Sequence, residues 1–125
     1  MSTEENKDVV RRALEALNKR DLGTLDQLIG GPEEWKRRLA NLLTAFPDVQ
    51  LIQEDQIAEG DQVVERWTIR GTHQGHFQGI PPTGKRVTYT GIDIFRIVDG
   101  KLVLVGQSVD RLGMMQQLGV IPPMG

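Results

Sequence analysis

The chain changes its hydrophobic period once, at Pro47, and this change constrains the fold more than any other feature. Before Pro47, apolar residues recur every three or four positions, which is the spacing of amphipathic helices. After Pro47, apolar and polar residues alternate, which is typical of half-buried strands. Helices followed by a run of strands predict an α+β fold with an antiparallel sheet, rather than the alternating order of nucleotide-binding folds.

Turn and cap signals divide the two halves into elements. The expected helices start at a Ser2 or Thr3 cap, span 22–28, run from Pro32 to Phe46, and cover 111–118. The expected strands cover 49–57, 63–71, 86–98 and 101–110. Asp99-Gly100 is the strongest kind of hairpin signal. Because no internal repeat or low-complexity linker interrupts this order, we expect residues 1–125 to form one domain.

Composition excludes several classes of function. The absence of cysteine excludes disulfides and thiolate chemistry. Acidic and basic residues are interspersed at a net charge of −2, so no nucleic-acid partner is predicted. The first residues are polar and acidic, and no apolar run reaches membrane-spanning length. We therefore expect no membrane partner and a cytoplasmic location.

Five stretches in the second part of the chain form a recognisable set. They are Ala45-Phe46-Pro47-Asp48-Val49; 57–64 with Arg66-Trp67-Thr68; Gly71-Thr72-His73 with 77–85; 91–97 with Asp99-Gly100-Lys101; and 110–119. In this order and spacing they resemble the SnoaL-like polyketide cyclases, a branch of the cone-shaped fold shared with ketosteroid isomerase. The resemblance implies helices packed on a strongly curved antiparallel sheet (a cystatin-like cone), an apolar cavity, and a homodimer through the sheet.

The same resemblance implies an activity. Characterised cyclases of this family close a ring by an intramolecular aldol reaction without metal or cofactor. It therefore implies a cofactor-free cyclase or isomerase that acts on a small apolar carbonyl compound. In the family, an Asp at the end of the last long strand is the general acid and base, and motif position assigns this role to Asp110.

The sequence also departs from the family pattern. Leu28-Ile29-Gly30-Gly31-Pro32 joins the second and third helices directly, where members usually carry a further segment. Gly106 stands where many members have a tryptophan that lines the cavity. Both changes remove wall from the expected pocket. They leave open a second interpretation, a non-catalytic module of the same fold that binds a small apolar ligand or dimerises.

Two polar residues are the main catalytic candidates. Asp110 would be desolvated at the floor of a cavity, which raises a carboxyl pKa toward neutrality, but Asp is also a favoured helix cap. His73 belongs to the Gly-Thr-His motif and can polarise a carbonyl at the cavity mouth, or lie with His76 at the surface. Two histidines without a third patterned ligand predict no metal site.

The remaining candidates line the cavity or stabilise the sheet. Strict alternation places Leu104, Gly106 and Ser108 on the same strand face as Asp110, so we expect them to contact the ligand. Trp67 is interpreted as core or cavity wall, and Tyr89 as a packing residue or a donor to a bound carbonyl. A structural Arg–Asp pair across the sheet is expected between Arg66 or Arg70 and Asp93.

Overall fold

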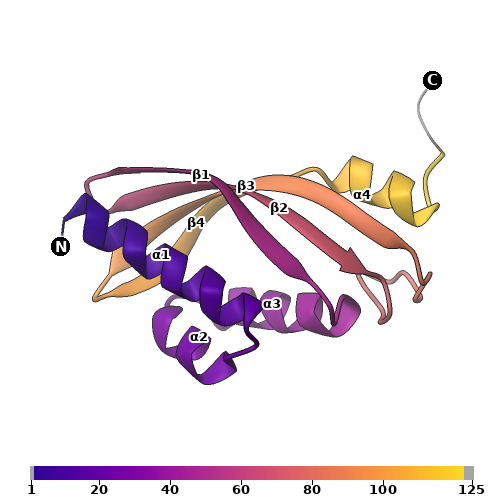
Figure 1. Cartoon of the computed structure of the whole chain (residues 1–125), viewed down its shortest axis with the longest axis horizontal. Helices are drawn as coiled ribbons and strands as arrows, with labels where there is room; N and C mark the ends of the chain where they lie inside the picture. The colour runs from indigo at the N-terminus through magenta and orange to yellow at the C-terminus, as the bar shows by residue number, and fades with distance from the viewer. Residues whose placement is uncertain (1, 123–125) are drawn as a thin grey trace.

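A computed structural model describes residues 2–122 and shows the three N-terminal helices on one face of a four-stranded sheet, with the last helix at one end of that sheet (Figure 1). The elements are α1 (Thr3–Asn18), α2 (Leu22–Leu28), α3 (Glu33–Ala45), β1 (Gln50–Glu59), β2 (Gln62–Thr72), β3 (Arg86–Val98), β4 (Lys101–Val109) and α4 (Arg111–Leu118). Each strand pairs antiparallel with the next, in the order β1-β2-β3-β4. The predicted α+β class and the order of its elements are confirmed. Within residues 2–122, no helix is long and apolar enough to cross a membrane.

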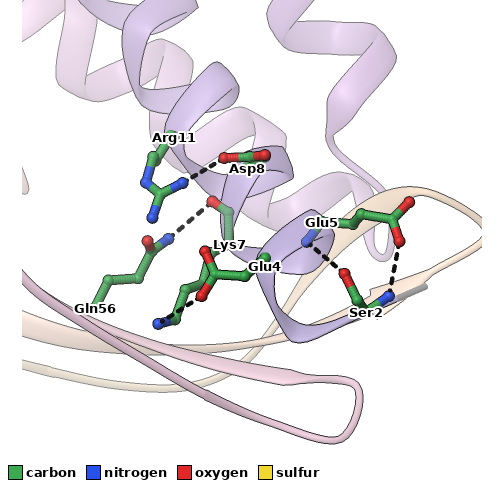
Figure 2. A network of polar contacts seen from close by, with 7 residues as sticks. All are labelled: Ser2, Glu4, Glu5, Lys7, Asp8, Arg11 and Gln56. Atoms are coloured by element: carbon green, nitrogen blue, oxygen red, sulfur yellow. Dashed lines mark hydrogen bonds and ion pairs between the residues drawn. The ribbon is translucent and has the colours of Figure 1, made fainter.

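The start of α1 follows the predicted capping chemistry (Figure 2). Ser2 Oγ accepts from the Glu5 N–H at 3.1 Å, and the Glu5 carboxylate accepts from the Ser2 N–H at 3.0 Å. This reciprocal pair satisfies backbone donors that the first turn leaves free. Gln56 of β1 donates to the Lys7 carbonyl at 2.9 Å, so the cap is also tied to the sheet.

The core is divided into two clusters. The first joins α1 and α2 to one end of the sheet, where Trp35 of α3 also contacts Phe95 with ring centroids 5.6 Å apart. The second joins the end of α3 and the buried side of α4 to the other end, around Phe46 and Trp67. α3 contributes to both clusters, and the sheet beneath its middle is covered less closely than at either end.

Helix α4 lies beside β3, where β4 no longer pairs with it (Figure 1). β4 accompanies β3 only as far as Gly91, which leaves the backbone of 86–90 without a strand on that side. Gln117 of α4 replaces part of the strand, because its amide accepts from the Thr88 N–H and donates to the Thr88 carbonyl, both at 2.7 Å. These two hydrogen bonds between the Gln117 side chain and the β3 backbone fix α4 at one end of the curved sheet.

The junction between α2 and α3 is as short as predicted. Only Ile29-Gly30-Gly31-Pro32 separates the two helices. Ile29 forms an isolated parallel bridge with Leu102, and the Gly30 N–H donates to the Leu102 carbonyl at 2.8 Å. Beyond this point β4 has no neighbouring strand on its outer side among the described residues, so its edge is open from Val103 onward.

The ring of Trp67 depends on a glycine in the neighbouring strand. Gly91 pairs with Trp67 across β2 and β3, and a Cβ at Gly91 would lie 2.2 Å from a ring atom. We expect Gly91→Ala to displace the indole and to lower the free energy of unfolding by about 1–3 kcal/mol, because a well-packed core resists added volume. Urea unfolding followed by tryptophan fluorescence measures both effects.

Gly106 supplies the control for this substitution. A Cβ at Gly106 would meet Ile94 at 3.7 Å, an ordinary contact, so Gly106→Ala should change stability little. If Gly91→Ala unfolds at the same urea concentration as Gly106→Ala and keeps the wild-type emission, the close packing of Trp67 on Gly91 is wrong.

Candidate functional site

A pocket of about 410 Å³ lies between α3 and the inner face of the sheet. Its apolar wall consists of aromatic and aliphatic side chains from both core clusters, among them Trp35, Leu39, Leu42, Leu51, Trp67, Ile69, Phe77, Tyr89, Val109 and Met114. Its polar groups are few: Arg38, Asn41, His76, Gln78, Asp93, Gln107 and Arg111. An apolar pocket with a small number of convergent polar groups is the usual form of a small-molecule site.

The most buried charged group of this pocket is Asp93 on β3. Its side chain points inward with those of Tyr89 and Phe95, and only 9% of its surface is exposed. Gln107 Nε2 of β4 donates to Asp93 Oδ1 at 2.8 Å. Arg38 of α3 donates to Gln107 Oε1 at 2.6 Å. Because a guanidinium can only donate, Arg38 fixes the orientation of the Gln107 amide and directs its N–H to Asp93.

A β-bulge in β4 places Gln107 on the inner face. Phe95 pairs with Leu104 but Ile94 pairs with Gly106, so Val105 is an additional residue on β4. One additional residue moves every later side chain to the opposite face of the sheet. The expectation of strict alternation along β4 is therefore wrong beyond Leu104.

The bulge determines where the expected β4 ligand residues lie. Gly106 and Ser108 pair with the outward-facing Ile94 and Ile92, away from the pocket. Leu104 faces inward but packs against the first core cluster and does not line the pocket. Trp67 and Tyr89, by contrast, form part of the pocket wall, with ring centroids 6.0 Å apart.

A second buried carboxyl group lies beside Asp93. Glu65 of β2 pairs directly with Asp93 across the sheet and is 3% exposed, and its Oε1 has no hydrogen-bond partner among the described residues. Both groups line a small cavity of about 60 Å³ behind the pocket. The expected Arg–Asp pair at this position is wrong: Arg66 faces outward and pairs with Asp55 at 2.6 Å, while Asp93 faces Glu65.

Burial dominates the protonation of both carboxyl groups. Loss of water, and after it the charge of Asp93, raises the pKa of Glu65 to about 8, so Glu65 is protonated at neutral pH. Burial also raises the pKa of Asp93, but the Gln107 hydrogen bond, the nearby Trp67 indole and the charge of Arg38 oppose that rise. Two adjacent carboxyl groups with different surroundings thus differ in their readiness to hold a proton.

The pocket that Asp93 lines also offers neutral donors. The Trp67 indole nitrogen is buried without a hydrogen-bond partner among the described residues. Burial raises the pKa of Tyr89 to about 12, with the charge of Arg111 opposing, so its phenol keeps its proton. An N–H and an O–H in the wall of a pocket that also holds a carboxylate are suited to stabilise a developing oxyanion.

His73 is fully buried but does not line the pocket. Its Nδ1 accepts from the Thr83 backbone N–H at 3.2 Å, and its backbone N–H donates to the Lys85 carbonyl at 2.9 Å. These bonds close the base of the loop that joins β2 to β3. The imidazole also lies 5.4 Å from the Phe46 ring, centroid to centroid. His76, three residues later, is the histidine that lines the pocket.

Asp110 caps α4 in the structure. Its Oδ1 accepts from the Gly113 N–H at 3.0 Å, and the residue is exposed and outside the pocket lining. A Cβ at Gly113 would lie 2.3 Å from the other carboxylate oxygen, so glycine there accommodates the cap. The helix-cap interpretation thus describes the observed contact, and a catalytic role for Asp110 stays a prediction.

Comparison with known proteins defines the family of this chain. The SnoaL-like polyketide cyclase profile matches residues 7–118. The aklanonic acid methyl ester cyclase DnrD of Streptomyces peucetius is 30% identical, with 90% of this chain and 89% of the relative covered. The chain belongs to the SnoaL-like polyketide cyclase family. The nogalonic acid methyl ester cyclase of Streptomyces nogalater is also 30% identical, over 71% of this chain and 67% of that enzyme.

Solved structures of the family share this architecture. AclR of Streptomyces galilaeus, described as a putative hydroxylase, superposes with a TM-score of 0.88 at 29% identity, covering 99% of this chain and 87% of that one. TsrD of Streptomyces laurentii gives a TM-score of 0.86 at 28% identity, with coverages of 97% and 99%. The cone fold inferred from the motifs is confirmed.

Glu65 should make stability depend on pH. Between its ordinary pKa of 4.5 and its folded value of about 8, the unfolded chain loses a proton that the folded chain keeps. The contribution of Glu65 to the free energy of unfolding is therefore complete below pH 4.5, and it is lost as the pH rises toward about 8. We expect Glu65→Gln to remove a slope of up to about 1.4 kcal/mol per pH unit, measured by urea unfolding from pH 5 to 8.5.

Glu59→Gln on the same sheet is the control, because Glu59 is exposed and should leave the slope unchanged. If Glu65→Gln loses stability with pH as steeply as the wild type, Glu65 is not the buried group that titrates in this range.

Proposed function

We propose that this protein is a cofactor-free cyclase or isomerase of small, polyketide-like carbonyl compounds, with Asp93 as the general acid and base. The observation that carries the proposal is a carboxylate, 9% exposed, in the wall of an apolar pocket, held by an oriented hydrogen bond from Gln107. Perturbed carboxyl groups inside clefts are candidates for acid–base catalysis. Family membership supplies the reaction class.

The chemistry requires one group that removes and returns a proton. In an intramolecular aldol closure, the Asp93 carboxylate removes a proton from the carbon next to a carbonyl. The resulting enolate carbon attacks a second carbonyl carbon, a C–C bond forms, and the new alkoxide takes the proton back. The Tyr89 hydroxyl and the Trp67 N–H are the donors that stabilise the oxyanions.

Asp93 is a better candidate than Asp110 on physical grounds. The Asp110 carboxylate is exposed and already accepts a backbone bond at the start of α4. Proton transfer needs hydrogen-bond reach of the substrate, and Asp93 faces the pocket whereas Asp110 does not line it. For the same reason Tyr89 replaces His73 as the proposed donor to the carbonyl.

The test compares Asp93→Asn with Asp110→Asn. The first assay measures exchange of α-hydrogens for deuterium in β-dicarbonyl compounds by NMR, and the second measures ring closure of aklanonic and nogalonic acid methyl esters and of the corresponding free acids. We expect Asp93→Asn to lower either rate by about 100-fold or more, the usual contribution of a general base. Asp110→Asn should stay within a few-fold of wild type, because Asn is also a good cap.

Three results would contradict this assignment. A larger loss in Asp110→Asn than in Asp93→Asn would make Asp110 the catalytic group. Equal losses with lowered stability would indicate a structural effect of both. Tight binding of these compounds without exchange or ring closure in the wild type would favour the alternative, a non-catalytic binding module.

We propose in addition that the protein is a homodimer through the outer face of the sheet. Ile57, Val64, Ile94 and Gly106 form one row across all strands, and Ile57 is 68% exposed. A continuous apolar row on a sheet surface is suited to contact a second copy. Ile94→Asp should shift the protein toward monomer in sedimentation velocity.

Val98→Asp is the matched control for this variant, because Val98 lies on the same face of β3 at its end, outside the row. A wild-type protein that sediments as a monomer at all concentrations would contradict the dimer, and so would an Ile94→Asp variant that remains dimeric.

A further inference from the structure

Two arginines on different helices line the same pocket. Arg38 comes from the middle of α3 and Arg111 from the first turn of α4. Neither forms an ion pair with a carboxylate among residues 2–122, whereas Arg11, Arg66 and Arg96 all do. The positive charge of this pocket is thus not neutralised by its surface neighbours.

Each of these arginines is held by a glutamine amide. Arg38 donates to Gln107 Oε1 at 2.6 Å, and Arg111 donates to Gln78 Oε1 at 2.8 Å. A neutral amide orients a guanidinium without cancelling its charge. Because a guanidinium has five N–H donors, both retain donors for another acceptor. Planar guanidinium groups bind carboxylates in a two-bonded geometry.

The edge of β4 connects the two positions. A shallow depression of about 450 Å³ is lined by Arg38, Arg111 and the 104–107 stretch with Val109. It shares Arg38, Gln107, Val109 and Arg111 with the main pocket, so the two hollows are neighbours at this edge. Within residues 2–122, no strand pairs with the outer edge of β4 beyond the bridge between Ile29 and Leu102.

The other charged groups around the pocket are compatible with an anion at its mouth. Asp93 is the only carboxylate that lines it within the described residues; it is buried at the inner wall and accepts from Gln107. His76, from the loop between β2 and β3, also lines the pocket and adds no negative charge to it. The exposed end of the pocket is thus basic, and its inner end acidic.

From this arrangement we propose that Arg38 and Arg111 form an anion subsite at the pocket mouth, and that the carbonyl substrate carries a free carboxylate there. This rests on the proposed function and adds a substrate class to it. Two of the relatives described above, from Streptomyces peucetius and Streptomyces nogalater, are named for methyl esters, in which the acid carries no charge. This protein would select the acid over the corresponding ester.

The test uses two probes that differ only in this group: anthraquinone-2-carboxylate and its methyl ester. Binding is titrated at pH 7 by quenching of tryptophan fluorescence and by calorimetry, in low and high salt. We expect the wild-type protein to bind the acid about tenfold or more tightly than the ester, as charge-assisted bonds allow. Added salt should weaken only the acid.

Arg111→Gln is the main variant, because Arg38 also orients Gln107. It should lower affinity for the acid about fivefold to tenfold and leave the ester unchanged, while Arg111→Lys should recover part of the loss. Arg37→Gln is the control: it removes the same charge from the neighbouring position of α3, and Arg37 does not line the pocket.

Two results would overturn the subsite. The first is an ester that binds as tightly as the acid. The second is an Arg37→Gln loss as large as that of Arg111→Gln, which would indicate only a general effect of charge.

Turnover separates this inference from the proposed function. Selective binding of the acid, retained in Asp93→Asn, together with no ring closure or exchange by the wild type, would leave the subsite valid and refute the catalysis. Catalysis that proceeds equally well on acid and ester substrates would support the proposed function and refute the anion subsite.

Discussion

The hydrogen bond from Gln107 to Asp93 links three elements, and the geometry of the site depends on it. It requires the bulge at Val105, since an unbroken β4 would turn Gln107 outward. It requires Arg38, which fixes the direction of the amide, and therefore the position of α3 over the sheet. This one hydrogen bond in the pocket wall thus depends on the bulge in β4 and on the guanidinium of Arg38 on α3.

Burial of two carboxyl groups on adjacent strands has a cost that the surrounding fold must offset. Glu65 is the deeper of the two and has an oxygen without a partner, so it remains inside only as the neutral acid. Asp93 is slightly more exposed to solvent and accepts a hydrogen bond from Gln107, so it is the carboxyl group that is able to carry a negative charge. Replacing both with apolar residues would favour stability, whereas retaining them favours proton transfer.

Much of the fold could be predicted from the sequence, because it follows from local signals. The alternation of β3 from Arg86 to Val98, the Asp99-Gly100 turn and the Ser2 cap all depend on neighbouring residues. The site could not be predicted in the same way, because an inserted residue such as Val105 has no signature in hydrophobic alternation. One signal was available: Asp93 lies among Tyr89 and Phe95 on an inward face, where a carboxylate needs an explanation.

The four-residue stretch Ile29-Gly30-Gly31-Pro32 joins two packed helices and lies against the edge of β4 at Leu102 and Val103. Its ends belong to helices that are packed by their own apolar faces, while its side faces the open edge of β4. Extra length inserted here would lie along the edge of β4, next to the shallow depression lined by residues 104–107, without disturbing the pairing of the sheet or the Asp93–Gln107 hydrogen bond. The size and covering of the pocket in such a scaffold can therefore diverge through loop growth at one position, while the surroundings of Asp93 stay constant.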